Sequence, residues 1–217
     1  MDVDVTKAGP VNAAPAALDG IGDRLREERE RAGLSQRKLA GRIGLSPSLI
    51  SQLESGSTKP SVGTLYAIVT ELGVSLDSVL RGDDEVASPR AAESSVTDTL
   101  VVNPEGRQSI DLASGVKWEE LSAVTEDGVD FLFATYEVGG ASTPDESLMR
   151  HHGREYGYVV SGTLGIQIGF NDFTLEPGDS IAFDSERPHR LYNKGDVPVK
   201  AVWFVVGRGS DERTNQP

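Results

Sequence analysis

Residues 33–56 read GLSQRKLAGRIGLSPSLISQLESG and predict two short helices joined by a tight turn. Ser35 and Ser46 each stand just before an apolar-periodic segment, where a hydroxyl can cap free backbone N–H groups. Pro47 follows at the first helical position, the one that suits proline. Glycines close both segments, because glycine adopts the left-handed conformation without strain. A glycine-containing turn between two short helices is typical of the helix-turn-helix.

The same pattern of serine starts and glycine stops continues on both sides of this pair. It predicts five helices, near residues 20–32, 36–43, 47–55, 61–72 and 76–81. Apolar residues recur at helical spacing in these segments, so we expect them to share one core. The residues assigned to that core are Leu25, Leu39, Ile43, Leu49, Ile50, Leu53, Leu65, Ile68, Val69, Leu72, Val79 and Leu80.

The third of these helices is expected to leave one polar face outside the core. That face, called the reading face below, consists of Ser46, Pro47, Ser48, Ser51 and Gln52. It contains no acid, so it can enter the major groove without repelling phosphate. Gln can bond adenine through N6 and N7, and Ser can bond several base edges. The alternative is a helix bundle whose Ser and Gln are simply solvated, because a fold does not dictate a function.

Residues 20–81 resemble the five-helix domain of lambda-type repressors, the XRE family. The resemblance is carried by GLSQRKLAGRIGLSPSLISQLESGSTKPSVGTLYAIVTELGVSLDSVL. It implies that the reading face contacts bases and that Gln36 and Lys59 contact the DNA backbone. It also implies a structural ion pair between Arg29 and Glu54, so neither is assigned a contact with DNA.

The charge of the chain first argues against a nucleic-acid partner. Its 217 residues carry a net charge of −13, and DNA-binding domains are usually basic. The charge is uneven, however: residues 20–82 hold nine basic and seven acidic side chains, and residues 83–217 hold eleven and 24. A small basic surface can therefore exist within an acidic protein. Arg37 belongs to that surface and is added to the expected DNA contacts.

Composition excludes several classes of protein. The chain has no cysteine, which excludes disulfides, thiolate metal ligands and a cysteine nucleophile. Its longest apolar run, 201–206, is far shorter than the ~20 residues of a membrane helix, and no signal-peptide pattern begins the chain. We therefore expect a cytoplasmic protein without a membrane partner. Residues 1–19, 83–97 and 211–217 are expected to be a disordered arm, a linker and a flexible tail.

Residues 98–210 follow a different pattern from the helical part. Short segments rich in β-branched and aromatic residues are separated by Gly, Asn, Asp and Pro. Leu164, Ile166 and Ile168 alternate with other residues, as in a half-buried strand. The pattern indicates a sandwich or barrel of the jelly-roll type. The expected fold class is thus an all-α domain over 20–82 followed by an all-β domain over 98–210.

All three histidines lie in the β-rich part, at positions 151, 152 and 189. His151 and Glu155 are four residues apart, and a strand–turn–strand return could bring His189 opposite them. Two imidazoles and one carboxylate with open positions form the facial triad that suits Fe(II), and they also suit Zn, Mn or Ni. The sequence therefore predicts one candidate site for a divalent ion.

The β-rich part also resembles the cupin superfamily. The first cupin motif has two His one residue apart, a Glu four residues later and a Gly seven residues after that Glu. The second motif ends in a His and an Asn. The residues that stand at these positions are Met149, His151, Glu155, Gly162, Gly178, His189 and Asn193. His152 falls between motif positions and is expected to point away from the site.

Met149 replaces the first cupin His, which leaves two interpretations open. A thioether is a poor ligand for hard divalent ions, so the typical four-ligand site is excluded. The barrel could then bind a small molecule without metal, or nothing. Alternatively, three ligands suffice, as the resemblance to the fosfomycin-forming epoxidase family implies. That family joins a similar helical domain to a cupin with a His, Glu, His iron triad.

These features predict a transcriptional regulator and not an enzyme. We expect a homodimer that binds a double-stranded DNA operator and a small-molecule effector, with the effector in the cupin. The expected lining of the effector pocket is Met149, Val159, Ile166, Phe183, Leu191 and Trp203. The alternative is a mononuclear iron oxygenase or epoxidase with a vestigial helical domain. The reading face favours the regulator, because an enzyme needs no acid-free helix-turn-helix surface.

Overall fold

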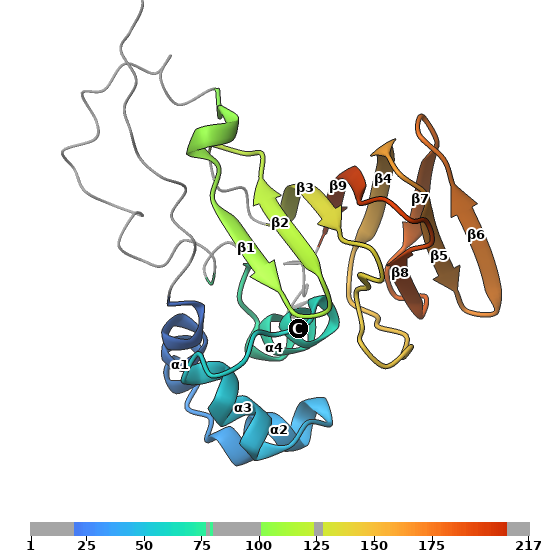
Figure 1. The fold of residues 1–217 in the computed structure, drawn as a ribbon. Helices are drawn as coiled ribbons and strands as arrows, with labels where there is room; N and C mark the ends of the chain where they lie inside the picture. The colour runs from blue at the N-terminus through green and yellow to red at the C-terminus, as the bar shows by residue number, and fades with distance from the viewer. Residues whose placement is uncertain (1–19, 77–78, 80–100, 124–127, 208–217) are drawn as a thin grey trace, which may run out of the picture.

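The computed structural model describes residues 20–76, 79, 101–123 and 128–207, which form a helical domain and a β-sandwich domain (Figure 1). The predicted arm, linker and tail lie outside these residues. The helices are α1 (Ile21–Arg31), α2 (Gln36–Ile43), α3 (Pro47–Glu54) and α4 (Val62–Leu72). They confirm the first four predicted segments. The fifth, 76–81, falls largely outside the described residues, although Leu76 and Val79 are buried.

The helix ends follow the predicted serine and glycine chemistry. The hydroxyl oxygens of Ser35, Ser46 and Ser61 accept hydrogen bonds from backbone N–H groups three residues on, at 3.1–3.2 Å. Gly44 and Gly73 end α2 and α4 in the left-handed conformation. Each cap satisfies a backbone group that the helix itself leaves unpaired, so the helix bounds are set locally.

The predicted helical core is confirmed for eleven of its twelve residues, to different depths. The fully buried members are Leu25, Leu39, Ile50, Leu53, Leu65, Ile68, Val69 and Val79. Ile43, Leu49 and Leu72 are partly buried and pack against the others. Leu80 lies outside the described residues.

The β-sandwich domain consists of two antiparallel sheets, as the strand pattern predicts. A six-stranded sheet has the order β1-β2-β3-β9-β4-β7, and a three-stranded sheet has the order β6-β5-β8. A short 3₁₀ helix, Pro104–Gly106, precedes them. The strands are β1 (Ser109–Leu112), β2 (Val116–Glu120), β3 (Val129–Tyr136), β4 (Arg154–Ser161), β5 (Leu164–Ile168), β6 (Asn171–Leu175), β7 (Ser180–Asp184), β8 (His189–Asn193) and β9 (Val199–Val206).

Alternation along β4 and β9 decides which side chains face the interior. Glu155, Gly157 and Val159 of β4 are buried, while the residues between them are exposed. Gly157 lies directly opposite Trp203 of β9, and a Cβ at position 157 would come within 2.0 Å of the indole ring. Glycine is therefore required here, because it lets the indole lie across β4.

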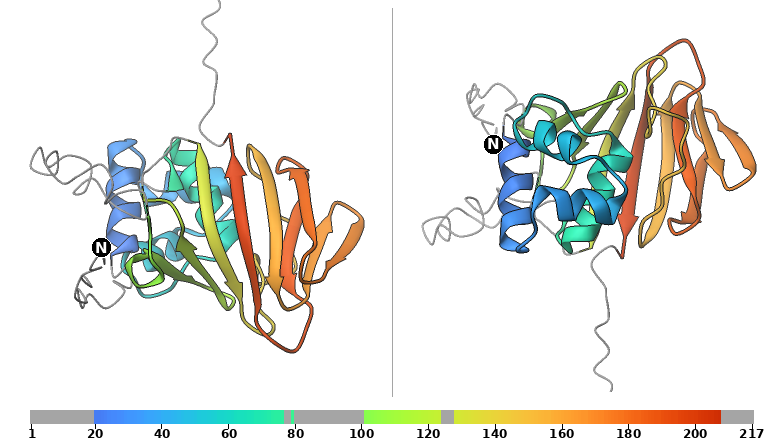
Figure 2. Two further views of the ribbon diagram at one scale, coloured as in Figure 1. Left: turned by 90° about the horizontal axis from the view of Figure 1, so that it is seen from above. Right: turned by 90° about the horizontal axis from the view of Figure 1, so that it is seen from below.

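The two domains pack directly against each other. Figures 1 and 2 show the helices gathered on one side of the strands. The N–H of Gly63 donates to the carbonyl of Ser142 at 3.1 Å, and the N–H of Ala113 donates to the carbonyl of Pro60 at 2.8 Å. Buried apolar residues of both domains belong to one continuous core. Among the described residues, no helix is long and apolar enough to cross a membrane.

Candidate DNA-binding face and candidate metal centre

The structure places the whole reading face of α3 in solvent. Ser46, Pro47, Ser48, Ser51 and Gln52 are all exposed, whereas Ile50 and Leu53 are buried on the opposite side of the helix. The hydroxyl oxygen of Ser46 also accepts the capping bond from the Leu49 N–H. The geometry thus leaves these five side chains available to an external partner.

The other expected DNA contacts differ in how free they are. Arg37 is exposed. Lys59 is exposed and pairs with Asp111 of β1 at 3.4 Å; an exposed pair of this kind contributes under about 1 kcal/mol, so Lys59 can exchange partners. Gln36 is half-buried, and its Nε2 donates to Oε2 of Glu54 at 2.8 Å. The amide group of Gln36 is therefore partly committed within the domain.

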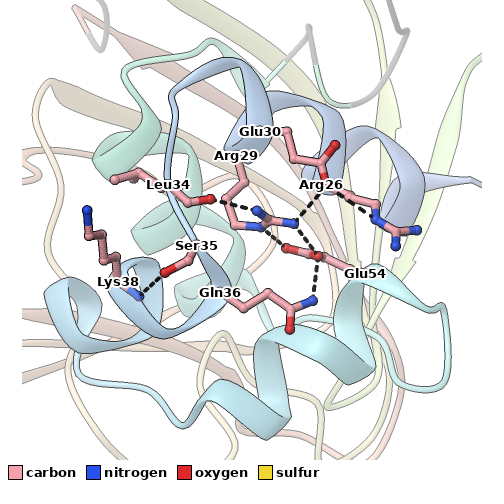
Figure 3. Close-up of polar contacts among 8 residues, drawn as sticks. All are labelled: Arg26, Arg29, Glu30, Leu34, Ser35, Gln36, Lys38 and Glu54. Atoms are coloured by element: carbon pink, nitrogen blue, oxygen red, sulfur yellow. Dashed lines mark hydrogen bonds and ion pairs between the residues drawn. The ribbon is translucent and has the colours of Figure 1, made fainter.

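A buried ion pair ties α1 to α3 behind the reading face, as the family resemblance implied (Figure 3). Nη2 of Arg29 donates to Oε2 of Glu54 at 2.9 Å, and Nε donates to the other carboxylate oxygen. The third guanidinium nitrogen donates to the carbonyl of Leu34. Burial alone would raise the pKa of Glu54, but the hydrogen bonds from Arg29 and Gln36 outweigh it and hold the pKa below its ordinary value. The ion pair fixes the orientation of α3.

In the β-sandwich domain, the three predicted ligands come together. Glu155 is the second residue of β4, His151 lies three residues before that strand begins, and His189 begins β8. Nε2 of His151 and Nε2 of His189 each lie 3.0 Å from Oε1 of Glu155. All three side chains are buried. Burial and convergence of this kind are absent from an ordinary solvated surface.

The tautomers of the two histidines leave lone pairs directed at the carboxylate. Nδ1 of His151 lies 3.0 Å from the carbonyl of His152, and Nδ1 of His189 lies 2.8 Å from the carbonyl of Arg187. A carbonyl can only accept, so each Nδ1 carries a proton, and in the neutral imidazole Nε2 is then bare. Both Nε2 atoms and Oε1 of Glu155 are buried without a hydrogen-bond partner. Three lone-pair atoms at one point fit a cation, and no other described group supplies one there.

The second carboxylate oxygen of Glu155 has a hydrogen-bond donor in Trp203. Nε1 of Trp203 donates to Oε2 of Glu155 at 2.7 Å, so only Oε1 is left for a ligand. Burial and the nearby Glu155 raise the pKa of Tyr136. The phenol of Tyr136 therefore stays neutral beside Glu155.

The remaining predicted residues differ in burial and in contact with the triad. His152 is exposed and its Nδ1 lies 2.9 Å from Glu186, so it points away as expected. Met149 is half-buried and exchanges two backbone hydrogen bonds with His189, at 2.8 and 2.9 Å. Phe183 meets the His189 ring edge-on at 5.1 Å. The other expected pocket residues, Val159, Ile166, Leu191 and Trp203, are buried inside the domain.

Sequence reasoning missed one residue beside the site, Tyr66 of α4. Its ring stacks on the His151 ring with centroids 4.3 Å apart. A signal was present: α4 buries Val62, Tyr66 and Ile68 as well as its bundle-facing residues. At about 100° per residue these side chains span an arc of roughly 160°, wider than one bundle contact needs. A second packing partner for α4 could have been inferred, but not which one.

Comparison with known proteins gives matches in both domains. The helix-turn-helix family profile matches residues 25–79, and the cupin domain profile matches residues 132–205. The HTH-type transcriptional regulator PuuR of Escherichia coli (strain K12) is 28% identical over 172 residues, which is 79% of this chain and 86% of that protein. The uncharacterized HTH-type transcriptional regulator y4dJ of Sinorhizobium fredii is 35% identical over 65 residues, 30% of this chain and 84% of that protein.

A solved structure matches across both domains. It is an HTH_3 family transcriptional regulator from Vibrio cholerae, with a TM-score of 0.61 and 22% sequence identity. The alignment covers 86% of this chain and 94% of that one. At this identity the likeness establishes the shared fold, a helix-turn-helix domain joined to a β-sandwich.

Proposed function

Because this chain belongs to the XRE-type helix-turn-helix transcriptional regulators that carry a cupin domain, we propose that it binds a DNA operator through α3 and senses a small effector in its β-sandwich domain. Residues 20–82 act as the DNA-binding domain and 98–210 as the sensor. The observation that carries the DNA-binding part is the reading face, fully exposed on a helix that a buried ion pair holds in place. Because α3 is already held in place before DNA binds, less conformational entropy is lost on association.

The sensor holds one divalent ion through His151, Glu155 and His189. Three unpartnered lone-pair atoms support this assignment, and their chemistry suits Fe, Zn, Mn or Ni. When bound, such an ion keeps one net positive charge beside two neutral imidazoles and one carboxylate, and so favours an anionic effector at its open positions. Met149 contributes no hard ligand, which leaves a coordination position of the ion open for that effector.

The functional form is a homodimer joined through the outer face of the six-stranded sheet. The large apolar side chains exposed on this face are Tyr156, Tyr158, Val160, Phe204 and Val206. The charged residues at its rim are Arg154, Asp184 and Lys200. An apolar centre with a polar rim is the usual anatomy of an interface. A second copy is the partner that fits, because lambda-type domains bind two half-sites about one helical turn apart.

The reading face is tested by comparing a base-reading variant with a phosphate-contacting one. After the operator is selected from randomised DNA, Gln52→Ala should weaken specific binding by about 1–3 kcal/mol and relax the preference at one position. Lys59→Ala should weaken binding to all sequences alike and reduce the salt dependence by about one counterion. An unchanged sequence preference in Gln52→Ala would refute the assigned face.

The metal site is tested by elemental analysis of protein purified without chelators. We expect about one divalent ion per chain, lost in His151→Ala and in His189→Ala. His152→Ala is the matched control, because His152 is exposed and pairs with Glu186. Equal metal content in all four proteins, or none in the wild type, contradicts the site.

The dimer is tested by sedimentation of two matched variants. Tyr158→Glu places a charge in the apolar centre of the proposed interface and should give monomers that bind the operator more weakly. Phe170→Glu is the control, because Phe170 is fully exposed in the turn between β5 and β6. A wild type that sediments as a monomer excludes this interface.

One observation favours a second candidate function. The triad has three ligands, the facial arrangement that mononuclear iron oxygenases use. We favour the regulator because an oxygenase has no use for the exposed, acid-free face of α3. A wild type that lacks sequence-specific DNA binding, yet consumes oxygen when loaded with Fe(II), would reverse this preference.

A further inference from the structure

The candidate metal centre is not enclosed by the β-sandwich domain alone. Tyr66 belongs to α4 of the helical domain, and its ring lies on the ring of the ligand His151, with an interplanar angle of 28°. Both residues are buried, with 3% and 5% of their surface exposed. Tyr66 also contacts Trp118 of β2, with centroids 5.4 Å apart. The helical domain thus supplies one wall of the site.

Close docking of α4 depends on a glycine. A Cβ on Gly63 would come within 2.9 Å of Cγ2 of Thr143 and 3.5 Å of Cβ of Met149. Thr143 cannot easily turn aside, because it is buried and its hydroxyl donates to the carbonyl of Ser147 at 2.6 Å. Met149 in turn exchanges backbone hydrogen bonds with the ligand His189. One turn of α4 therefore packs on the ligand His151 through Tyr66 and, at Gly63, lies against Met149, the backbone partner of the ligand His189.

The His151 ring has few other restraints. Its Nδ1–H donates to the adjacent backbone carbonyl of His152, and its edge meets the His189 ring at 5.3 Å. The Tyr66 stack covers its face. Groups that orient a metal-binding histidine typically change metal affinity 10- to 100-fold. The position of α4 should consequently set how well His151 can bind an ion.

We propose that Tyr66 and Gly63 make α4 part of the metal centre, so that ion binding and docking of the helical domain are thermodynamically coupled. The inference rests on the proposed occupancy of the triad by a divalent ion. Coupling is reciprocal: docking tightens ion binding, and the ion tightens docking by the same factor. An effector that enters on the Tyr66 side must displace α4.

Displacement of α4 would reach the reading face through the core of the helical domain. Leu65, Ile68 and Val69 of α4 are packed in the same buried cluster as Leu39 of α2 and Ile50 of α3. A packed core transmits such a shift as a rigid-body change and does not absorb it locally. The effector signal therefore needs no path through the segment that joins the domains in sequence.

The test measures Zn²⁺ affinity of the full chain by competition with a chromophoric chelator. Tyr66→Ala should weaken Zn²⁺ binding about tenfold or more, and Tyr66→Phe, which keeps the ring, by less than about threefold. Gly63→Ala should weaken binding in the same direction. Gly41→Ala is its matched control, because Gly41 is also helical but a Cβ there meets nothing within 4 Å. Replacing Gly63 or Gly41 by alanine stabilises the helix itself by up to about 1 kcal/mol in both variants. A difference between these two variants in Zn²⁺ affinity therefore reports the docking of α4.

Hydrogen exchange of the α4 amides provides a second readout that does not depend on Tyr66. Zn²⁺ should slow their exchange in the wild type and in Gly41→Ala, and less in Gly63→Ala. Unchanged Zn²⁺ affinity in folded Tyr66→Ala and Gly63→Ala, with equal protection of α4, overturns the coupling and leaves the metal centre intact. A wild type that binds no Zn²⁺ overturns the metal centre itself and the coupling with it.

Discussion

Two buried carboxylates, Glu54 in the helical domain and Glu155 in the β-sandwich domain, have opposite surroundings. Both are almost fully buried, with 5% and 2% of their surface exposed. Glu54 faces the guanidinium of Arg29, a cation that the chain itself provides. Glu155 faces two imidazoles whose bare nitrogens lie 3.0 Å from Oε1.

The two carboxylates differ in whether their hydrogen-bond partners are complete. A buried charge is tolerated when its partners are complete, and Glu54 meets that condition. Oε1 of Glu155 is left without a hydrogen bond, although its other oxygen is satisfied by Trp203. Such an orphaned buried atom, beside two imidazole nitrogens, marks a position that suits a cation. Burial by itself would not have distinguished the two sites.

The largest effect on stability is expected at the ion pair of Arg29 and Glu54. Arg29→Met leaves the Glu54 carboxylate buried without its cation, so we expect the helical domain to lose about 3–5 kcal/mol of unfolding free energy. Urea unfolding followed by circular dichroism at 222 nm measures this loss. Arg29→Met with Glu54→Leu should recover much of it, because the pair is replaced by apolar packing. A small loss in the single variant would mean that water reaches Glu54.

The next effect distinguishes the two carboxylates directly. Zn²⁺ at 100 times its Kd should raise the unfolding free energy of the β-sandwich domain by about 2.7 kcal/mol. Glu155→Gln should abolish this increase, because the amide is a far weaker ligand. His152→Gln should retain it. Tryptophan fluorescence follows this domain, since both tryptophans, Trp118 and Trp203, lie within its strands. Equal stabilisation of Glu155→Gln would disprove its role as a ligand.

A third comparison removes one hydrogen-bond donor from each carboxylate. Trp203→Phe deletes the Nε1–H bond to Glu155 and should destabilise the β-sandwich domain by about 2 kcal/mol. Gln36→Leu deletes the matching bond to Glu54. Its effect should be smaller, about 1 kcal/mol, because Gln36 is half-buried and Arg29 remains. Chemical denaturation of both variants tests the order, and the reverse order would contradict the burial argument.

Acid should reveal the smallest effect, the linkage of Glu54. Its pKa is depressed in the folded state, so its contribution is present above the ordinary pKa of 4.5 and is lost as the pH falls through the folded pKa. The slope is at most about 1.4 kcal/mol per pH unit for one proton. We expect the unfolding free energy, followed by circular dichroism at 222 nm, to fall less steeply with decreasing pH in Glu54→Gln than in the wild type. Identical slopes would exclude this linkage.

Much of the fold could be predicted because its determinants are local. Serine caps and glycine stops set the bounds of α2, α3 and α4 within one or two residues. Period-two alternation likewise identified β5, where Leu164, Ile166 and Ile168 are buried. Two details depended on pairing between strands and could not be predicted. One is the indole of Trp203 lying across Gly157, and the other is the bond from that indole to Glu155.

The sequence by itself determined the two domains, the exposed reading face and the identity of the three candidate ligands. Short-range spacing carries that information, since caps, helical periodicity and the interval between His151 and Glu155 are all read along the chain. Only the tertiary structure decided that Tyr66 lies on His151 and that Gly63 admits α4 against Met149. Such contacts join residues far apart in sequence, and no local preference specifies them. These contacts are specified by the packing of the apolar surface of α4 against that of the β-sandwich domain, because burial favours the arrangement in which both surfaces are covered.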